Sequence, residues 1–213
     1  MNFYTPRMFS DLPDQRELID CQRQLIVPNS EEILGGVFSS RVGVVVDNEE
    51  NPGPYDAVVE AVTRKSERQS KYYLEELTLI DILEYVKSVV KKATPYSPSR
   101  YNSLVEKRWG LKGRASAPDE PEFMVGLSDL LIQGANTCQN YALLAGATIR
   151  LLQRQEERCG GINPDFAVSI ENGRPWTNHT DRHVYTTLNT GELTYTIDPT
   201  HPFVTQDSAK VRA

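Results

Sequence analysis

The chain has 213 residues, of which 39% are hydrophobic and 24% are charged, and its formal net charge at pH 7 is −6. This length suits one domain with an added arm, and no window approaches the roughly 20 consecutive apolar residues that a membrane span needs. We therefore exclude a membrane span. We also expect no nucleic-acid partner, because non-specific binding to phosphates depends on clustered Lys and Arg.

The cysteines of the chain are Cys21, Cys138 and Cys159, an odd number. The first residues, MNFYTPRMFSDLPDQRELID, lack the basic start and the apolar run of a Sec signal peptide. We therefore expect a cytoplasmic protein without a disulfide framework, with secretion by a route other than Sec left open.

Residues 1–70 are interpreted as an N-terminal arm packed on a core that spans residues 71–213. A helical pattern covers residues 15–25 (QRELIDCQRQL), and a β-like run (VFSSRVGVVVD) follows at residues 37–47. The run ends in NEENPGPYD, which is rich in turn-forming residues.

The core begins with a strong helical pattern at residues 77–93 (LTLIDILEYVKSVVKKA), which stops at Thr94-Pro95. Residues 95–122 predict irregular structure with one short helix at PSRYNSLVEKRW. The next helical pattern runs from Cys138 to about Glu157. Because its residues are apolar or small on most sides, we expect this helix to be buried.

Three β-like runs follow at residues 166–170, 180–188 and 192–198, with turn residues between them. A helical half followed by an antiparallel sheet predicts the α+β class, with the helix that begins at Cys138 packed on the sheet.

Cys138 is the first candidate for chemistry. Asn136 and Thr137 favour the N-cap position of a helix, so Cys138 is predicted to lie in the first helical turn. Backbone N–H groups without helical partners and the positive end of the helix dipole lower the pKa of a thiol there, which favours the nucleophilic thiolate. The alternative is that Cys138 fills the core as a small apolar residue.

His183 and Asp198 are the candidate partners, because a nucleophilic cysteine needs a base and the base needs an orienting group. A register that opposes Asn189 and Glu192 makes one face of the last two runs almost entirely apolar. It pairs Val184 with Ile197, Thr186 with Tyr195 and Leu188 with Leu193. It also places His183 opposite Asp198, where a carboxylate can orient the imidazole. A three-residue loop with Gly191 in a bulge is an alternative turn, and a one-residue slip would move Asp198 to the other face.

Two other uses of these residues compete with catalysis. His179 and His183 have the H-x3-H spacing of zinc sites, which Cys138, Asp198 or His201 could complete. Residues four apart in a strand lie about 13 Å apart, however, so we predict no metal site. The second competitor is a structural histidine bonded to a buried aspartate.

The stretches NTCQNYALLAGATIRLL, RHVYTTL and YTIDPTHP together resemble the transglutaminase-like superfamily of papain-like Cys-His-Asp enzymes. Cys138, His183, Asp198, Pro199 and Thr200 match the motifs of that superfamily residue by residue. The resemblance covers about residues 75–202 and leaves out the arm. It implies a papain-like core, with the cysteine on a helix, the histidine on one strand and the aspartate on the next.

The sequence departs from the superfamily at two places. Many members have the pattern HxW, and here Tyr185 takes the place of the tryptophan. Many have glycine just before the cysteine, whereas Gly134 lies four residues upstream, which puts the oxyanion site in doubt. Stabilising the oxyanion of an acyl-transfer intermediate requires hydrogen-bond donors, and we expect these to be the Cys138 backbone N–H and one side-chain donor. The candidate donors are Gln133, Asn136 and Trp109, with Gln133 slightly favoured by the resemblance.

The expected reaction is acyl transfer on amide bonds by a Cys138-His183-Asp198 triad, with a protein or peptide substrate and no cofactor. The preferred hypothesis is a cysteine peptidase or related amide hydrolase. A protein-glutamine deamidase or transglutaminase, acting on other proteins as a toxin or effector, comes second. The third hypothesis is a binding module that keeps the fold but does not catalyse a reaction.

Overall fold

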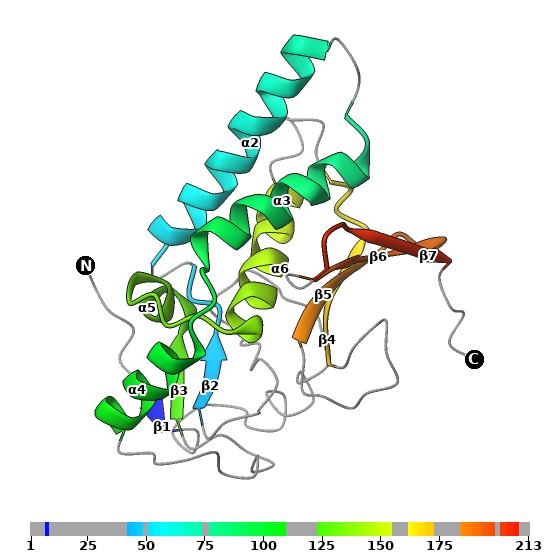
Figure 1. The fold of residues 1–213 in the computed structure, drawn as a ribbon. Coiled ribbons are helices and arrows are strands. Elements are labelled where there is room, and N and C mark those ends of the chain that lie inside the picture. The colour runs from blue at the N-terminus through cyan, green and yellow to red at the C-terminus, as the bar shows by residue number, and fades with distance from the viewer. Residues whose placement is uncertain are drawn as a thin grey trace.

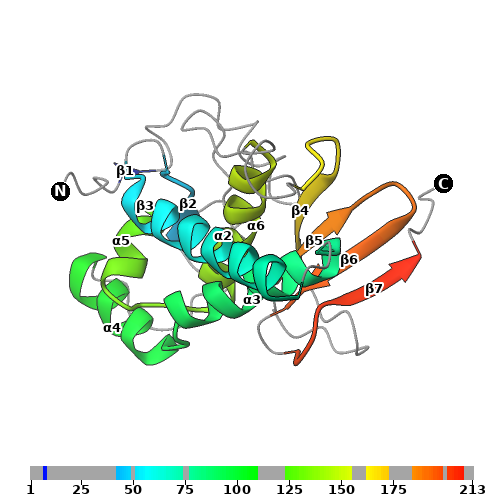
Figure 2. The same cartoon turned by 90° about the horizontal axis from the view of Figure 1, so that it is seen from above.

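The computed structural model describes residues 7–8, 42–48, 51–73, 77–109, 123–154, 162–172, 184–198 and 201–208. Helices fill the middle of the molecule, with a small sheet on one side and a larger sheet on the other (Figures 1 and 2). The helices are α2 (Gly53–Tyr73), α3 (Leu79–Ala93), α4 (Pro98–Trp109), α5 (Leu127–Ile132) and α6 (Cys138–Arg154). The strands are β1 (Arg7–Met8), β2 (Val42–Val45), β3 (Phe123–Gly126), β4 (Ala167–Asn172), β5 (Val184–Asn189), β6 (Leu193–Ile197) and β7 (Thr205–Ser208).

The larger sheet has the strand order β4-β5-β6-β7, and each neighbouring pair is antiparallel. Strands β4, β5 and β6 confirm the three β-like runs of the sequence, and the α+β class is confirmed with them. Strand β7 was not predicted. Its residues, TQDS, are polar and mostly exposed, so they lack the apolar alternation by which strands are recognised.

The small sheet joins segments that are far apart in the chain. Strand β3 lies between β1, to which it is antiparallel, and β2, to which it is parallel. Strand β2 lies within the β-like run predicted at residues 37–47. The predicted helix at residues 15–25 lies outside the described residues.

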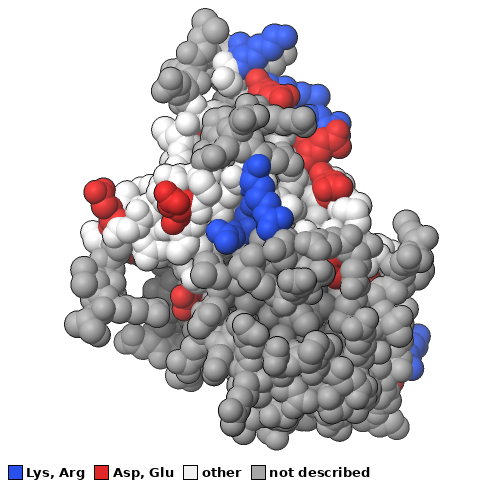
Figure 3. Space-filling view, turned by 180° about the vertical axis from the view of Figure 1, so that it is seen from behind, with Lys and Arg blue, Asp and Glu red and all other residues white. Residues whose placement is uncertain are grey.

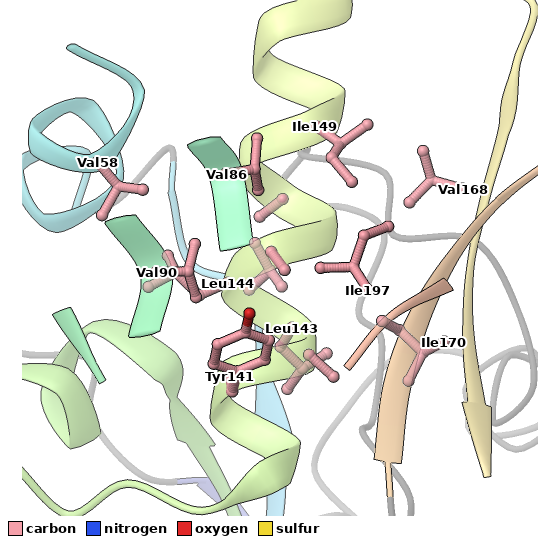
Figure 4. Close-up of a cluster of buried hydrophobic side chains, with 14 of the residues drawn as sticks. Val58, Val86, Val90, Tyr141, Leu143, Leu144, Ile149, Val168, Ile170 and Ile197 are labelled. Carbon is pink, nitrogen blue, oxygen red and sulfur yellow. The ribbon is translucent and has the colours of Figure 1, made fainter. Parts of the chain in front are cut away.

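Helix α6 is the centre of the core. It packs against α3, α2 and α5 on one side and against β4 and β5 on the other. Figure 4 shows Val86 and Val90 of α3 on one side of α6, and Val168, Ile170 and Ile197 of the sheet on the other. All of its residues from Gln139 to Ile149 are buried, which confirms the prediction of a buried helix.

Helix α2 packs into this core and connects it to the predicted N-terminal arm, residues 1–70. Val58, Val59 and Val62 are buried in the same hydrophobic cluster as α6, and Val44 of β2 is fully buried there too. Helix α2 packs against α3, α5 and α6. The domain boundary predicted between residues 70 and 71 therefore falls inside α2.

Helix α3 ends where the sequence predicts, and it begins at Leu79, two residues after the start of the predicted pattern. Thr78 is the N-cap of a capping box, in which its hydroxyl accepts from the Asp81 N–H and the Asp81 carboxylate accepts from the Thr78 N–H. The helix ends before Thr94, whose N–H donates to the Val90 carbonyl over 2.8 Å. The short helix expected at PSRYNSLVEKRW is α4, so this prediction is also confirmed.

Among the described residues, no helix has both the length and the apolar character needed to cross a membrane. Figure 3 shows the face opposite to that of Figure 1, where the basic and acidic side chains of the described part are intermixed.

Candidate active site

Cys138 follows a short loop between α5 and α6. Helix α5 ends in a Schellman motif, in which the Gly134 N–H donates to Leu131 O over 3.0 Å and the Ala135 N–H donates to Leu130 O over 3.0 Å. Gly134 adopts the left-handed conformation, with φ +62°, that this motif requires. The glycine four residues upstream of the cysteine therefore ends α5, and only residues 135–137 separate it from α6.

Cys138 is the first residue of α6, as predicted, and Thr137 precedes it as the N-cap. The Thr137 hydroxyl donates to Asn140 Oδ1 over 3.0 Å, and Asn140 Nδ2 donates to Ala135 O over 3.1 Å. The first helical bond joins the Tyr141 N–H to Thr137 O over 3.2 Å. The Cys138 side chain is half-buried and packs against the core. The packing restricts its position, and its partial exposure leaves it accessible to a reactant.

The start of β5 lies at the same end of the molecule as Cys138. At the far end of α6, Gln153 Nε2 donates to Phe166 O over 2.9 Å, directly before β4, and Ala167 of β4 pairs with Asn189 at the end of β5. One turn after Cys138, the Thr186 hydroxyl donates to Ala142 O over 2.8 Å. Helix α6 and strand β5 therefore run alongside each other in the same direction. Val184, which directly follows His183, lies toward the N-terminal end of α6.

The predicted register between β5 and β6 is wrong by two residues. Thr186 pairs with Ile197 instead of Tyr195, and Leu188 pairs with Tyr195 instead of Leu193. Val184 is accordingly not paired with Ile197, as had been expected. A shift by an even number of residues keeps every side chain on its face, so Val184, Thr186 and Leu188 all remain buried.

The turn explains the shift. The Thr190 N–H donates to Leu193 O over 2.9 Å, so the two central residues are Gly191 and Glu192. Gly191 has φ +92° and takes the first central position, where a type II′ turn requires glycine. The prediction had placed the centre of the turn one residue earlier, which changes the pairing by two.

Asp198 directly follows β6 and is 1% exposed. Continuing the observed register by one residue places it level with Tyr185 instead of His183, which corrects the predicted His183–Asp198 opposition. Burial first, then the charges of Glu171 and Asp198, raise the pKa of Tyr185. Burial first, then the charges of Asp198 and Glu84, raise the pKa of Tyr141 in α6. Asp198 thus interacts with β5 on one side and with the beginning of α6 on the other.

The remaining matched positions, His183, Pro199 and Thr200, lie outside the described residues. So does His179, and the zinc alternative depends on the two histidines together. His201 is described, and its Nδ1 lies 2.9 Å from Phe203 O. Within the part of the chain that the structure describes, no three His, Cys, Asp or Glu residues form a group suited to a metal ion.

The candidate oxyanion donors differ in what their amides contact. Gln133 is the C-cap of α5, and its Nε2 donates to Asp129 Oδ1 over 2.9 Å. Asn136 is fully buried two residues before Cys138, and within the described structure neither its Nδ2 nor its Oδ1 has a hydrogen-bond partner. Trp109 ends α4, and its side chain lies outside the described part of the chain. The geometry therefore favours Asn136 over Gln133, which reverses the order taken from the resemblance.

Lys87 of α3 is a residue that the sequence reasoning missed. Its side chain is 4% exposed, and it lies on the buried stripe of α3 with Leu83, Val86 and Val90. The pKa of Lys87 is lowered, mainly by burial; the charge of Glu84 opposes this shift, that of Lys91 adds to it, and that of Asp198 opposes it least. A lysine on the apolar stripe of an amphipathic helix is the signal that could have found it.

No family model matches the chain, and no curated protein or solved structure is detectably similar to it.

Proposed function

We propose that the protein is a cysteine-dependent acyl-transfer enzyme acting on amide bonds, most simply a cysteine peptidase or related amide hydrolase. The observation that carries the proposal is the meeting of three features at one end of the core. These are Cys138 at the start of α6, the first residue of β5, which His183 precedes in the sequence, and the buried Asp198 after β6.

The fold supports the same proposal. A helix that begins with the cysteine packs on an antiparallel sheet, in which β5 precedes β6 in the chain and pairs with it. A papain-like core of the transglutaminase-like type has this order, with the histidine on one strand and the aspartate on the next. We assign that core to the chain as part of the proposal.

In the reaction, the Cys138 thiolate attacks the amide carbonyl and His183 protonates the departing amine, which leaves a thioester on Cys138. His183 then takes a proton from water, which attacks the thioester and releases the acid and the thiol. Asp198 orients His183.

The oxyanion of the tetrahedral intermediate needs two donors in this proposal. The Cys138 backbone N–H is in the first helical turn, where no carbonyl within the helix accepts from it. Asn136 Nδ2 is the second donor. A buried amide whose donor is not used within the described structure costs folding free energy, and a developing negative charge at the substrate carbonyl would supply its missing acceptor.

The first test measures the thiol. Iodoacetamide at pH 6 should label Cys138 faster than Cys21 and Cys159, as followed by mass spectrometry of the peptides, because a depressed pKa gives more thiolate at that pH. Equal or slower labelling of Cys138 contradicts the proposal.

The second test asks which acyl acceptor is used. The protein and the matched variant Cys138→Ala are incubated with a mixed cell lysate, and the products are compared by mass spectrometry and ammonia release. New chain ends identify a peptidase, glutamine converted to glutamate with ammonia identifies a deamidase, and glutamine–lysine cross-links identify a transglutaminase. Products identical to those of the variant refute catalysis and leave the binding module.

A further inference from the structure

The loop before Cys138 is bonded to the start of α4. The Ser97 N–H donates to Asn136 O over 2.9 Å, and Tyr96 forms an isolated parallel β-bridge with Asn136. Ser97 O in turn accepts the first helical bond of α4, from the Tyr101 N–H over 3.1 Å. The first turn of α4 is therefore held at a point of the loop that lies two residues before Cys138.

Arg100, in this first turn, places its guanidinium against the same loop. A Cβ built on Gly134 would lie 2.7 Å from Arg100 Nη1, so the guanidinium occupies the space that a side chain at position 134 would take. The next residue, Tyr101, is 7% exposed and belongs to the hydrophobic core cluster. The turn that carries Arg100 is thus anchored both to the core and to the loop before Cys138.

The positive charge of Arg100 is available to a ligand. Its side chain is exposed, and among the described residues it forms neither an ion pair nor a hydrogen bond. The first turn of α4 contains no acidic residue that could neutralise it. Tyr96 is 71% exposed, so this side of the loop is open to solvent. A guanidinium in such a position can form paired hydrogen bonds with a carboxylate.

The loop limits how far the guanidinium can be from a group that reacts with Cys138. Gly134 and Cys138 are four residues apart in the chain, so their Cα atoms are at most about 14 Å apart. An extended peptide advances by about 3.3 Å per residue. A peptide whose amide lies at Cys138 therefore reaches Arg100 with a side chain within about four residues of that amide.

We infer that Arg100 is a specificity-determining residue, which selects proteins or peptides that carry Asp or Glu within about four residues of the amide attacked by Cys138. The inference names the substrate class of the proposed function and rests on that function for the attack by Cys138. The selection by charge itself requires only that a ligand reaches Cys138.

The test uses alkylating peptides as molecular rulers. Each probe has an N-terminal iodoacetyl group, a spacer of zero to about four glycines, and then Glu or Gln as the C-terminal amide. The rate at which each probe labels Cys138 is measured at low ionic strength by mass spectrometry. For at least one spacer length, the ratio of the Glu rate to the Gln rate should be about two- to five-fold higher in the wild type than in Arg100→Gln. The difference should shrink in about 0.5 M NaCl, because salt screens exposed charges.

The matched control is Arg68→Gln, which removes the same charge from an exposed arginine in the C-terminal half of α2. That half of α2 lies away from α4 (Figures 1 and 2), so the ratio should stay at the wild-type value. Arg100→Glu, which reverses the charge, should lower the ratio below that of Arg100→Gln. Equal ratios in the wild type and Arg100→Gln at every spacer length, or an equal loss in Arg68→Gln, overturn the inference.

Failure of the inference can be distinguished from failure of the proposed function. If the lysate products depend on Cys138, acidic residues should be enriched within about four positions of the modified amides, and Arg100→Gln should abolish that enrichment. Enrichment that is absent, or that persists in Arg100→Gln, overturns the inference while catalysis stands. If no product depends on Cys138 but the probe ratio responds to Arg100→Gln, the proposed function fails and the selection by charge at Cys138 stands.

Discussion

Replacing Gly134 by alanine tests how the loop before Cys138 is held. Gly134 has φ +62°, and a Cβ there would lie 2.7 Å from Arg100 Nη1. The left-handed conformation costs an L-residue about 1–2 kcal/mol. Reduced freedom of the unfolded chain returns about 0.4–1 kcal/mol. The exposed Arg100 side chain can move aside at little cost. We therefore expect Gly134→Ala to lower the free energy of unfolding by about 1 kcal/mol, as measured by urea denaturation.

The same variant should also change the rate at which iodoacetamide alkylates Cys138, because Gly134 sets the path of residues 135–137. Gly191→Ala is the matched control. Its φ of +92° also strains an L-residue, a Cβ added there would meet no atom within 4 Å, and its turn follows the end of β5 that is remote from Cys138. It should lose at least as much stability as Gly134→Ala, with the alkylation rate unchanged.

Combining Gly134→Ala with Arg100→Ala separates the two causes. If backbone strain dominates, removing the Arg100 side chain restores little of the lost stability. If Gly134→Ala is as stable as the wild type, or if both glycine variants alter alkylation equally, the reasoning about the loop is refuted.

Three further predictions concern residues around α6. Asn136→Ala should lower amide turnover by about 10²–10³-fold, while Gln133→Ala stays within a few-fold; the reverse order in steady-state kinetics would restore Gln133 as the donor. Thr186→Val should lower the free energy of unfolding by about 0.5–1.5 kcal/mol in thermal denaturation, because the buried hydrogen bond from Thr186 to Ala142 O is lost, and unchanged stability would contradict that bond. Burial and nearby charges raise the pKa of Tyr141 in the folded state, so its contribution to stability is full below about pH 10 and is lost as the unfolded chain ionises above it. Tyr141→Phe should therefore flatten the fall in unfolding free energy between about pH 9 and 11, and an unchanged slope would contradict the shift.

The helices with clear caps and periodicity could be predicted from the sequence. Helix α3 has an apolar stripe between the Thr78 capping box and Thr94, and α6 follows an Asn-Thr pair that favours the N-cap. Helix α2 was missed because Pro52-Gly53-Pro54 was interpreted only as a turn. Proline is also common in the first turn of a helix, and Val58, Val59 and Val62 continue at helical spacing.

The register of β5 and β6 could be predicted only up to an even shift. Alternation specifies which face a residue occupies, and pairings that differ by two residues satisfy it equally well. The turn chemistry carried the missing information, since glycine at the first central position of a type II′ turn selects Gly191-Glu192. The prediction weighed other turns and therefore placed Asp198 opposite the wrong residue while keeping it on the correct face.

The burial of Lys87 could not be predicted from its own helix, because it depends on how α6 and β6 pack against α3. The sequence showed a lysine on an apolar stripe but not the elements that cover it. Asn136 is a second case: its buried amide without a hydrogen-bond partner in the described structure, and the bond from the Ser97 N–H to its carbonyl, are visible only in the fold.

The burial of α6 would hold its first residue rigidly enough for the proposed chemistry. Residues one to three turns beyond Cys138 are enclosed by α2, α3, α5, β4 and β5, so the helix cannot shift without disturbing the core. Groups that a catalytic cysteine needs must be held within about 0.5 Å of the productive geometry. Asn136 belongs to the loop that enters α6, and Asp198 lies at the end of the strand that packs on α3. Their positions relative to Cys138 are therefore fixed by the same packed elements that give the chain its stability.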